Sequence, residues 1–93
     1  MRQPKLDCKF FGKIFKAKDN SEVPDDQYVV FLVNDNAFAA VLPEYLQACI
    51  RMGADDEQTD GVRRLIERVT DWRAKHLDKL KVPDASGEKM LQP

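Results

Sequence analysis

The feature that most constrains the fold is an amphipathic run in the C-terminal half, "GVRRLIERVTDWRAKHLDKL" at residues 61–80. At 100° per residue, its apolar positions and its histidine fall on an arc of about 140°, the width expected of a helix packed on a hydrophobic core. The acidic segment "ADDE" at residues 54–57 offers an N-terminal cap. The sequence therefore predicts one long helix over residues 56–80, with Gly61 as its weakest position. The positions on the arc are Val62, Leu65, Ile66, Val69, Trp72, His76, Leu77 and Leu80.

A second helix is predicted over residues 34–53, with Asp35 or Asn36 as N-cap and Gly53 as C-terminal stop. Pro43 leaves two alternatives open, because proline is accepted in a first turn but removes a hydrogen bond from a helix interior. Either the regular helix starts near Leu42 after a looser turn, or it bends at the proline. One stripe of this helix is apolar: Phe38, Val41, Leu42, Tyr45, Cys49 and Met52.

Two β-strands are expected ahead of the helices. "CKFFGKIFK" at residues 8–16 mixes aromatic residues with lysines, which is typical of a half-exposed strand with a bulge at Gly12, and "QYVVFLVN" at residues 27–34 is β-branched and aromatic. The fold class predicted is α+β, with an N-terminal β-hairpin packed on an antiparallel αα-hairpin (ββαα) whose second helix is long. Residues 1–81 form this single domain, and residues 82–93 a flexible tail.

The chain's length and composition limit its setting. At 93 residues, a chain buries only roughly 60–65 % of its unfolded surface, so a partner subunit is a natural source of stability. No apolar run is long enough to span a membrane, and the N-terminus lacks the apolar stretch of a signal peptide. Cys8 and Cys49 show no metal or redox spacing. We therefore expect a cytoplasmic protein in which both cysteines are small core residues.

The length of the second helix predicts a homodimer. A helix of roughly 25 residues is nearly 40 Å long, and a first helix of at most about 17 residues leaves its far third uncovered. That third carries the candidate dimer residues Trp72, His76, Leu77 and Leu80. Twofold pairing is the commonest closed arrangement, and a symmetric contact would bury Trp72 and bring His76 near its counterpart.

Charge is strongly segregated along the chain, although the net charge is only −1. Residues 1–18 carry six basic residues and Asp7, residues 19–60 carry ten acidic residues and Arg51, and residues 61–81 carry seven basic residues and three acidic ones. The acidic segment "SEVPDD" could occupy a basic cleft on another protein, which makes Glu22, Asp25 and Asp26 candidate partner-binding residues. Turn and cap chemistry is the alternative reason for these acids.

A basic flank of the long helix is the second candidate surface. Arg64, Arg68, Lys75 and Lys79 gather beside the apolar arc, where they could follow a phosphate backbone. A solvated helix edge is the simpler interpretation, since Asp71 and Lys75 form a favourable i,i+4 pair and the sequence pI of 5.8 is low for a nucleic-acid binder. Nucleic acid is therefore the disfavoured partner.

Catalysis is not expected. The chain has a single histidine, two serines and two cysteines on different predicted elements, so no nucleophile, base and orienting group recur in a known pattern. Cys8, Cys49 and His76 have no fourth ligand at a spacing typical of a metal site. The sequence also has no glycine-rich phosphate-binding loop. The prediction is a protein that is not an enzyme and has no catalytic residues, no metal site and no cofactor.

One further pattern runs through most of the chain: an apolar strand ending in Asp35, a helix with Leu42 and Tyr45, the turn "GAD" at 53–55, the set Val62, Leu65, Ile66 and Trp72, and "VPD" at 82–84. In this pattern, residues 29–84 resemble small uncharacterised proteins encoded by bacteriophages and prophages. The resemblance implies a phage accessory factor in the host cytoplasm. Its most concrete form is a non-enzymatic inhibitor that binds a host defence complex, as anti-CRISPR and similar anti-defence proteins do. The alternative is a nucleotide or nucleic-acid binder that uses the basic flank.

Overall fold

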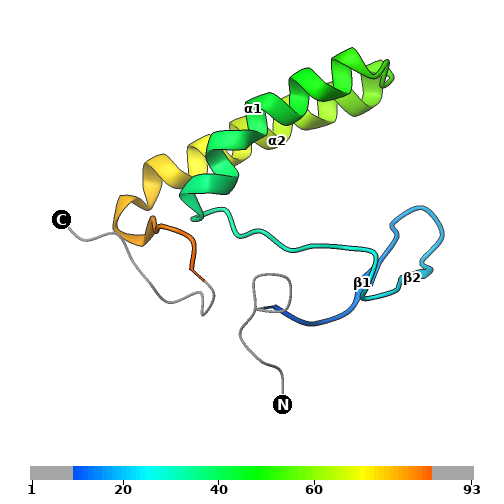
Figure 1. Ribbon diagram of the computed structural model, residues 1–93, viewed down its shortest axis with the longest axis horizontal. Helices are drawn as coiled ribbons and strands as arrows, with labels where there is room; N and C mark the ends of the chain where they lie inside the picture. The colour runs from blue at the N-terminus through cyan, green and yellow to red at the C-terminus, as the bar shows by residue number, and fades with distance from the viewer. Residues whose placement is uncertain (1–9, 85–93) are drawn as a thin grey trace.

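The fold is a β-hairpin followed by an αα-hairpin, and the computed structural model describes it for residues 10–84 (Figure 1). In chain order the elements are β1 (Ile14–Phe15), β2 (Glu22–Val23), α1 (Asn36–Arg51), α2 (Asp56–Lys75) and the short 3₁₀ helix η1 (Leu77–Lys79). This order confirms the predicted ββαα class, with α2 at 20 residues longer than α1 at 16. The predicted domain boundary at residue 81 stays a prediction, and residues 85–93 of the predicted tail lie outside the described part.

Helix α1 begins where the capping pattern places it. The Asp35 carboxylate accepts hydrogen bonds from the backbone N–H groups of Ala37 (2.8 Å) and Phe38 (3.0 Å), so Asp35 is the N-cap. From there the helix runs through Pro43, which lies in its interior. The alternative in which the regular helix starts near Leu42 is therefore wrong: the cap and the packing of the first two turns outweigh the one hydrogen bond that proline removes.

The turn between the helices is a Schellman motif. Gly53 has φ +77°, a conformation that favours glycine, and its N–H donates to the Ile50 carbonyl (3.1 Å), while Ala54 N–H donates to the Cys49 carbonyl (3.0 Å). Asp55 then caps α2 by accepting from Gln58 N–H (2.8 Å). The predicted stop at Gly53 and the predicted acidic cap are both confirmed.

Helix α2 ends at Lys75, five residues before the predicted end at residue 80. His76 leaves the helical conformation (φ −138°, ψ 50°), and its backbone N–H donates to the Arg73 carbonyl (3.2 Å). Its ring Nδ1 lies 2.7 Å from the Trp72 carbonyl oxygen, the atom that a continuing helix would offer to the His76 N–H. The imidazole therefore takes the place of the backbone donor and stops the helix, a role that apolar periodicity does not reveal.

The hydrophobic core lies between α1 and α2 and is small. Among the described residues, its buried apolar side chains are Leu42 and Cys49 from α1 and Val62 and Val69 from α2. The prediction of Cys49 as a core residue is confirmed, and its thiol is free; Cys8 lies outside the described residues. Half of the predicted α1 stripe faces away from α2, since Val41, Tyr45 and Met52 are exposed. Helix α2 covers only one edge of that stripe.

The β-hairpin is shorter than predicted and is displaced along the chain. Ile14 pairs with Val23 and Phe15 with Glu22, across a loop in which Asn20 takes the left-handed conformation (φ 61°). The predicted strand over residues 27–34 is wrong, because a turn that Gln27 N–H closes on the Pro24 carbonyl (2.9 Å) directs the chain away from β2. Pairing starts only at Ile14, so the bulge predicted at Gly12 is also wrong. Neither strand contacts a helix, and the hairpin stands apart from the helical pair.

A polar junction joins the start of α1 to the end of the described chain. Asp35 and Lys81 form a parallel bridge: Asn36 N–H donates to the Lys81 carbonyl and Lys81 N–H to the Asn34 carbonyl, both at 3.0 Å. From α2, the Arg73 guanidinium donates to the Val33 carbonyl (3.1 Å) and to Asn36 Oδ1 (2.6 Å). Lys81 is only 3 % exposed, and its ammonium lies 3.5 Å from the Asp84 carboxylate. These contacts fix the C-terminal end of α2 to the start of α1 within one copy of the chain.

Candidate functional site

The segment that links β2 to α1, residues 28–32, is the most unusual feature of the described chain, and we call it the connector. It runs as an extended trace from the hairpin to the start of α1 (Figure 1). Within the described residues, the backbone N–H and C=O groups of Val29, Val30 and Phe31 form no hydrogen bonds. Their β-branched and aromatic side chains are those that favour a strand. The connector thus has the composition of a strand but no neighbouring strand.

Both ends of the connector are fixed. At its start, the Tyr28 hydroxyl donates to the Gly12 carbonyl (2.9 Å), which ties it to the chain just before β1. At its other end, the Phe31 ring stacks on Phe38 of α1, with ring centroids 5.2 Å apart and planes 8° apart. Asp35 N–H then donates to the Leu32 carbonyl (3.1 Å). An exposed segment held at both ends loses less conformational entropy on binding than a free loop.

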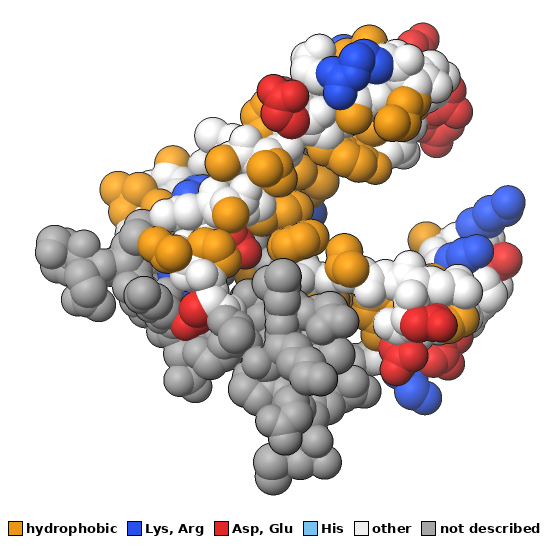
Figure 2. All heavy atoms as spheres, in the orientation of Figure 1, with side chains coloured by type: hydrophobic (Ala, Val, Ile, Leu, Met, Phe, Trp, Pro, Cys, Tyr) orange, Lys and Arg blue, Asp and Glu red, His pale blue; other side chains and the backbone are white. Residues whose placement is uncertain are grey.

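Three side chains of the connector are apolar and exposed to solvent, while Tyr28 and Val30 are half-buried. Val29 is 74 % exposed, and Phe31 and Leu32 are also exposed, as are Ile14 and Phe15 of β1. Figure 2 shows hydrophobic side chains along the hollow side of the molecule, between the helical pair and the hairpin. Monomeric proteins rarely expose so many large apolar side chains without a binding function.

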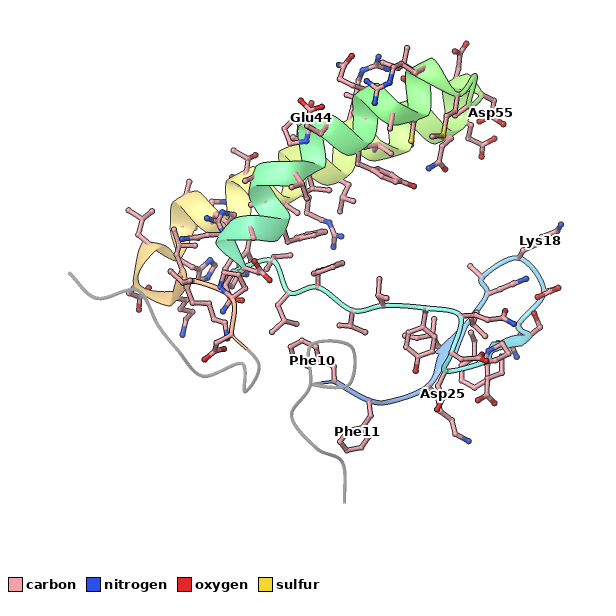
Figure 3. All side chains as sticks on the ribbon, in the orientation of Figure 1. Phe10, Phe11, Lys18, Asp25, Glu44 and Asp55 are labelled. Atoms are coloured by element: carbon pink, nitrogen blue, oxygen red, sulfur yellow. The ribbon has the colours of Figure 1, made fainter. Side chains whose placement is uncertain are left out.

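The acidic candidates lie on the hairpin side of the connector. Glu22 is in β2 opposite Phe15, and Asp25 and Asp26 follow in the turn after β2; all three are exposed. Figure 3 labels Asp25 at the base of the hairpin, well away from the helical pair. None of the three forms an ion pair within the described part of the chain. They are thus placed to add negative charge beside the connector.

The basic flank is less continuous than predicted. Arg64 and Arg68 are exposed neighbours on α2, but Lys75 pairs with Asp71 (3.1 Å) and Lys79 belongs to η1 rather than to the same helix. Because α2 stops at Lys75, the four cations do not follow one helical line. The acidic candidates and the basic flank are also on parts of the molecule that do not contact each other.

The four candidate dimer residues are placed differently from one another. Trp72 stacks on His76 within the chain, with ring centroids 4.1 Å apart, and both are half-buried. Since the Trp72 carbonyl can only accept, His76 Nδ1 carries the proton of that hydrogen bond. Leu77 is 72 % exposed, and Leu80 is half-buried. Trp72 and His76 thus cover each other in part within one copy, and the dimer itself stays a prediction.

Sequence reasoning did not single out Arg73 and Lys81, the two cations of the polar junction. Both stand among the basic residues of 61–81, and spacing alone does not separate them from solvated neighbours. The role of Arg73 depends on the backbone carbonyl of Val33, 40 residues away, and Lys81 joins the start of α1 through its backbone. A basic residue close to the apolar arc, such as Arg73 beside Trp72, is the only sequence signal that could have suggested a buried role.

One carboxylate of the hairpin loop has a lowered pKa. The Ser21 hydroxyl (2.6 Å) and then its backbone N–H (3.0 Å) donate to the Asp19 carboxylate and hold its pKa below the ordinary value. This pair stabilises the hairpin loop. Among residues 10–84, no three His, Cys, Asp or Glu side chains lie close enough to hold a metal ion.

Comparisons with known proteins add no relative: no family model, curated protein or solved structure matches the chain. As for membranes, neither α1 nor α2, the two long helices of the described part, has the length and hydropathy needed to cross a bilayer.

Proposed function

We propose that this protein is not an enzyme and acts by binding another protein, with the connector as its docking strand. The observation that carries the proposal is an extended segment of strand-forming residues whose backbone groups are unpaired between Val29 and Phe31. An extended segment of a partner can pair with such a backbone by β-strand addition, in which main-chain hydrogen bonds supply affinity and alternate side chains supply specificity.

Side-chain geometry supports this mode of binding. Along an extended backbone, Val29 and Phe31 project to one side and Val30 and Leu32 to the other. A partner strand would then cover exposed apolar surface at the same time as it satisfies backbone donors and acceptors. Glu22, Asp25 and Asp26 flank the start of the connector, so a partner segment with basic residues at one end would match the charge of this surface.

The biological setting in this proposal comes from the resemblance to phage and prophage proteins. It makes the protein a phage accessory factor in the host cytoplasm, and the partner a host protein, most concretely a component of a defence complex that the phage protein inhibits. A homodimer is part of the same proposal. Binding of nucleic acid through Arg64 and Arg68 is the competing function, which the broken basic flank disfavours.

The test is capture of partners from a host lysate by the tagged chain, with identification by mass spectrometry, with and without nuclease. Val29→Pro removes one backbone donor of the connector and breaks no hydrogen bond of the free protein. We expect it to weaken the captured interaction by about tenfold or more, because a strand-addition interface then lacks a ladder bond and leaves its partner carbonyl unsatisfied. Leu77→Glu, an equally exposed apolar position on η1, is the matched control and should leave capture unchanged.

Two results would contradict the proposal. A partner retained equally by wild type and Val29→Pro would show that the connector is not the docking strand. Capture that disappears with nuclease, or with Arg64→Glu and Arg68→Glu together, would instead support the nucleic-acid function. The double variant Asp25→Lys, Asp26→Lys tests the acidic residues separately, since unchanged binding would remove them from the interface.

A further inference from the structure

Helix α1 carries a second apolar surface that the connector does not include. Its members Val41, Tyr45, Ala48 and Met52 are spaced by four, three and four residues. These are successive d, a, d and a positions of a heptad pattern, which mark one side of a helix for packing against another helix. Val41 and Tyr45 are exposed, Met52 is 85 % exposed and Ala48 is half-buried. We call this set the α1 seam.

The neighbouring positions of the same pattern are already used. Leu42 and Cys49, one residue after the two d positions, are buried against α2. On the opposite flank of the seam, seven residues apart, lie Glu44 and Arg51, both exposed. Figure 3 labels Glu44 on the outer side of α1. Neither side chain forms an ion pair within the described residues.

We infer that the α1 seam is the contact between two copies of this chain, paired antiparallel about a twofold axis. In that arrangement Val41 lies opposite Met52 of the second copy, and the large Tyr45 lies opposite the small Ala48 of the second copy. The same symmetry brings equivalent flanks together, so Glu44 of each copy faces Arg51 of the other, which forms two ion pairs of opposite charge.

A parallel pair does not fit this surface as well. In parallel coiled coils the flank that carries Glu44 and Arg51 faces the other flank of the partner helix, which here holds Leu42 and Cys49 and is covered by α2. The antiparallel pair instead brings α2 of both copies to the same side of the two α1 helices and builds a four-helix bundle from two αα-hairpins. It also enlarges a core that, in residues 10–84 of one copy, holds only four buried apolar side chains.

This inference does not rest on the proposed docking strand, because the α1 seam and the connector share no residue. The test is sedimentation equilibrium of the full chain from low to high micromolar concentration. Wild type should approach twice the monomer mass of 10.7 kDa. Tyr45→Glu should raise the dissociation constant by about tenfold or more, since it places a charge at the centre of the seam. Circular dichroism checks that this exposed position leaves the fold intact. Ile50→Glu, at an exposed apolar position on the opposite side of α1, is the control that should not change the mass.

The decisive test exchanges the charges of Glu44 and Arg51. Glu44→Arg alone and Arg51→Glu alone each create two like-charged contacts and should weaken self-association severalfold. A mixture of the two single variants should associate more tightly than either alone, because each then offers the charge that the other lacks. Wild type that remains a monomer at high micromolar concentration, a dimer insensitive to Tyr45→Glu, or a mixture no tighter than the single variants would each overturn the inference.

Discussion

Arg73 is the residue whose removal should affect the stability of this protein most clearly. Its guanidinium joins α2 to two groups at the start of α1: the Val33 carbonyl at 3.1 Å and Asn36 Oδ1 at 2.6 Å. Arg73→Met keeps most of the aliphatic stem but removes both donors. A hydrogen bond from a charged group contributes about 1.5–3 kcal/mol when well placed, and this side chain is only half-buried. We therefore expect a loss of roughly 2–3 kcal/mol in the free energy of unfolding.

That loss is large for a domain of this size. A 93-residue chain has a total stability on the order of 5–14 kcal/mol, and each kcal/mol shifts the melting temperature by about 4–8 °C. The assay is urea unfolding followed by Trp72 fluorescence and, independently, by circular dichroism.

Arg63→Met is the matched control on the same helix. Arg63 forms an exposed ion pair with Asp60 at 3.0 Å, an interaction worth about 0–1 kcal/mol. Equal losses for the two variants would refute the assignment of Arg73 to the polar junction, and so would a loss below about 1 kcal/mol for Arg73→Met.

Three other predictions follow from single positions. Gly53→Ala should cost about 1–2 kcal/mol because of its positive φ, whereas Gly12→Ala, which meets no atom within 4 Å, should be nearly neutral in the same unfolding assay. Val69→Ala should cost about 2 kcal/mol, since Val69 is 2 % exposed, and a loss near zero would show that the core is not where α1 and α2 meet. Because the pKa of Asp19 is lowered in the folded protein, its hydrogen bonds with Ser21 stabilise the hairpin loop at pH values above the ordinary pKa of 3.8. This stabilisation is lost as the pH falls through the lower pKa of the folded state. The Ser21 amide resonance should follow that titration in wild type, and Asp19→Ala should abolish it.

The helices could be predicted from sequence because their boundaries depend on local chemistry. Asp35 and Asp55 accept hydrogen bonds from the next few backbone N–H groups, and Gly53 adopts the conformation that glycine favours. These effects act within four residues. The end of α2 could not be predicted in this way, because the apolar positions continue through Leu77 and Leu80 and the stop comes from the His76 ring and the Trp72 carbonyl.

The sites were harder to predict because they depend on what covers a segment. Residues 27–34 have the composition of a strand, but whether such a segment pairs depends on a neighbour, and the turn at Pro24–Gln27 removes that neighbour. Likewise, one apolar stripe on α1 could not reveal that α2 would cover Leu42 and Cys49 and leave Tyr45 and Met52 exposed. The apolar period identifies which face of a helix is apolar, but it does not show how much of that face a neighbouring helix will cover.

The central claim is that the connector is the docking strand for another protein. Hydrogen exchange of the amides of Val29, Val30 and Phe31 tests it most directly. In the free protein these amides should exchange at nearly the rate of an unstructured chain, because nothing in the described chain accepts their hydrogen bonds. In complex with the captured partner, those that join the new ladder should slow by about a hundredfold or more, while the exposed α2 surface around Arg64 and Arg68 stays unchanged. Strong protection of the connector in the free monomer, or protection in the complex that leaves the connector out, would contradict the account.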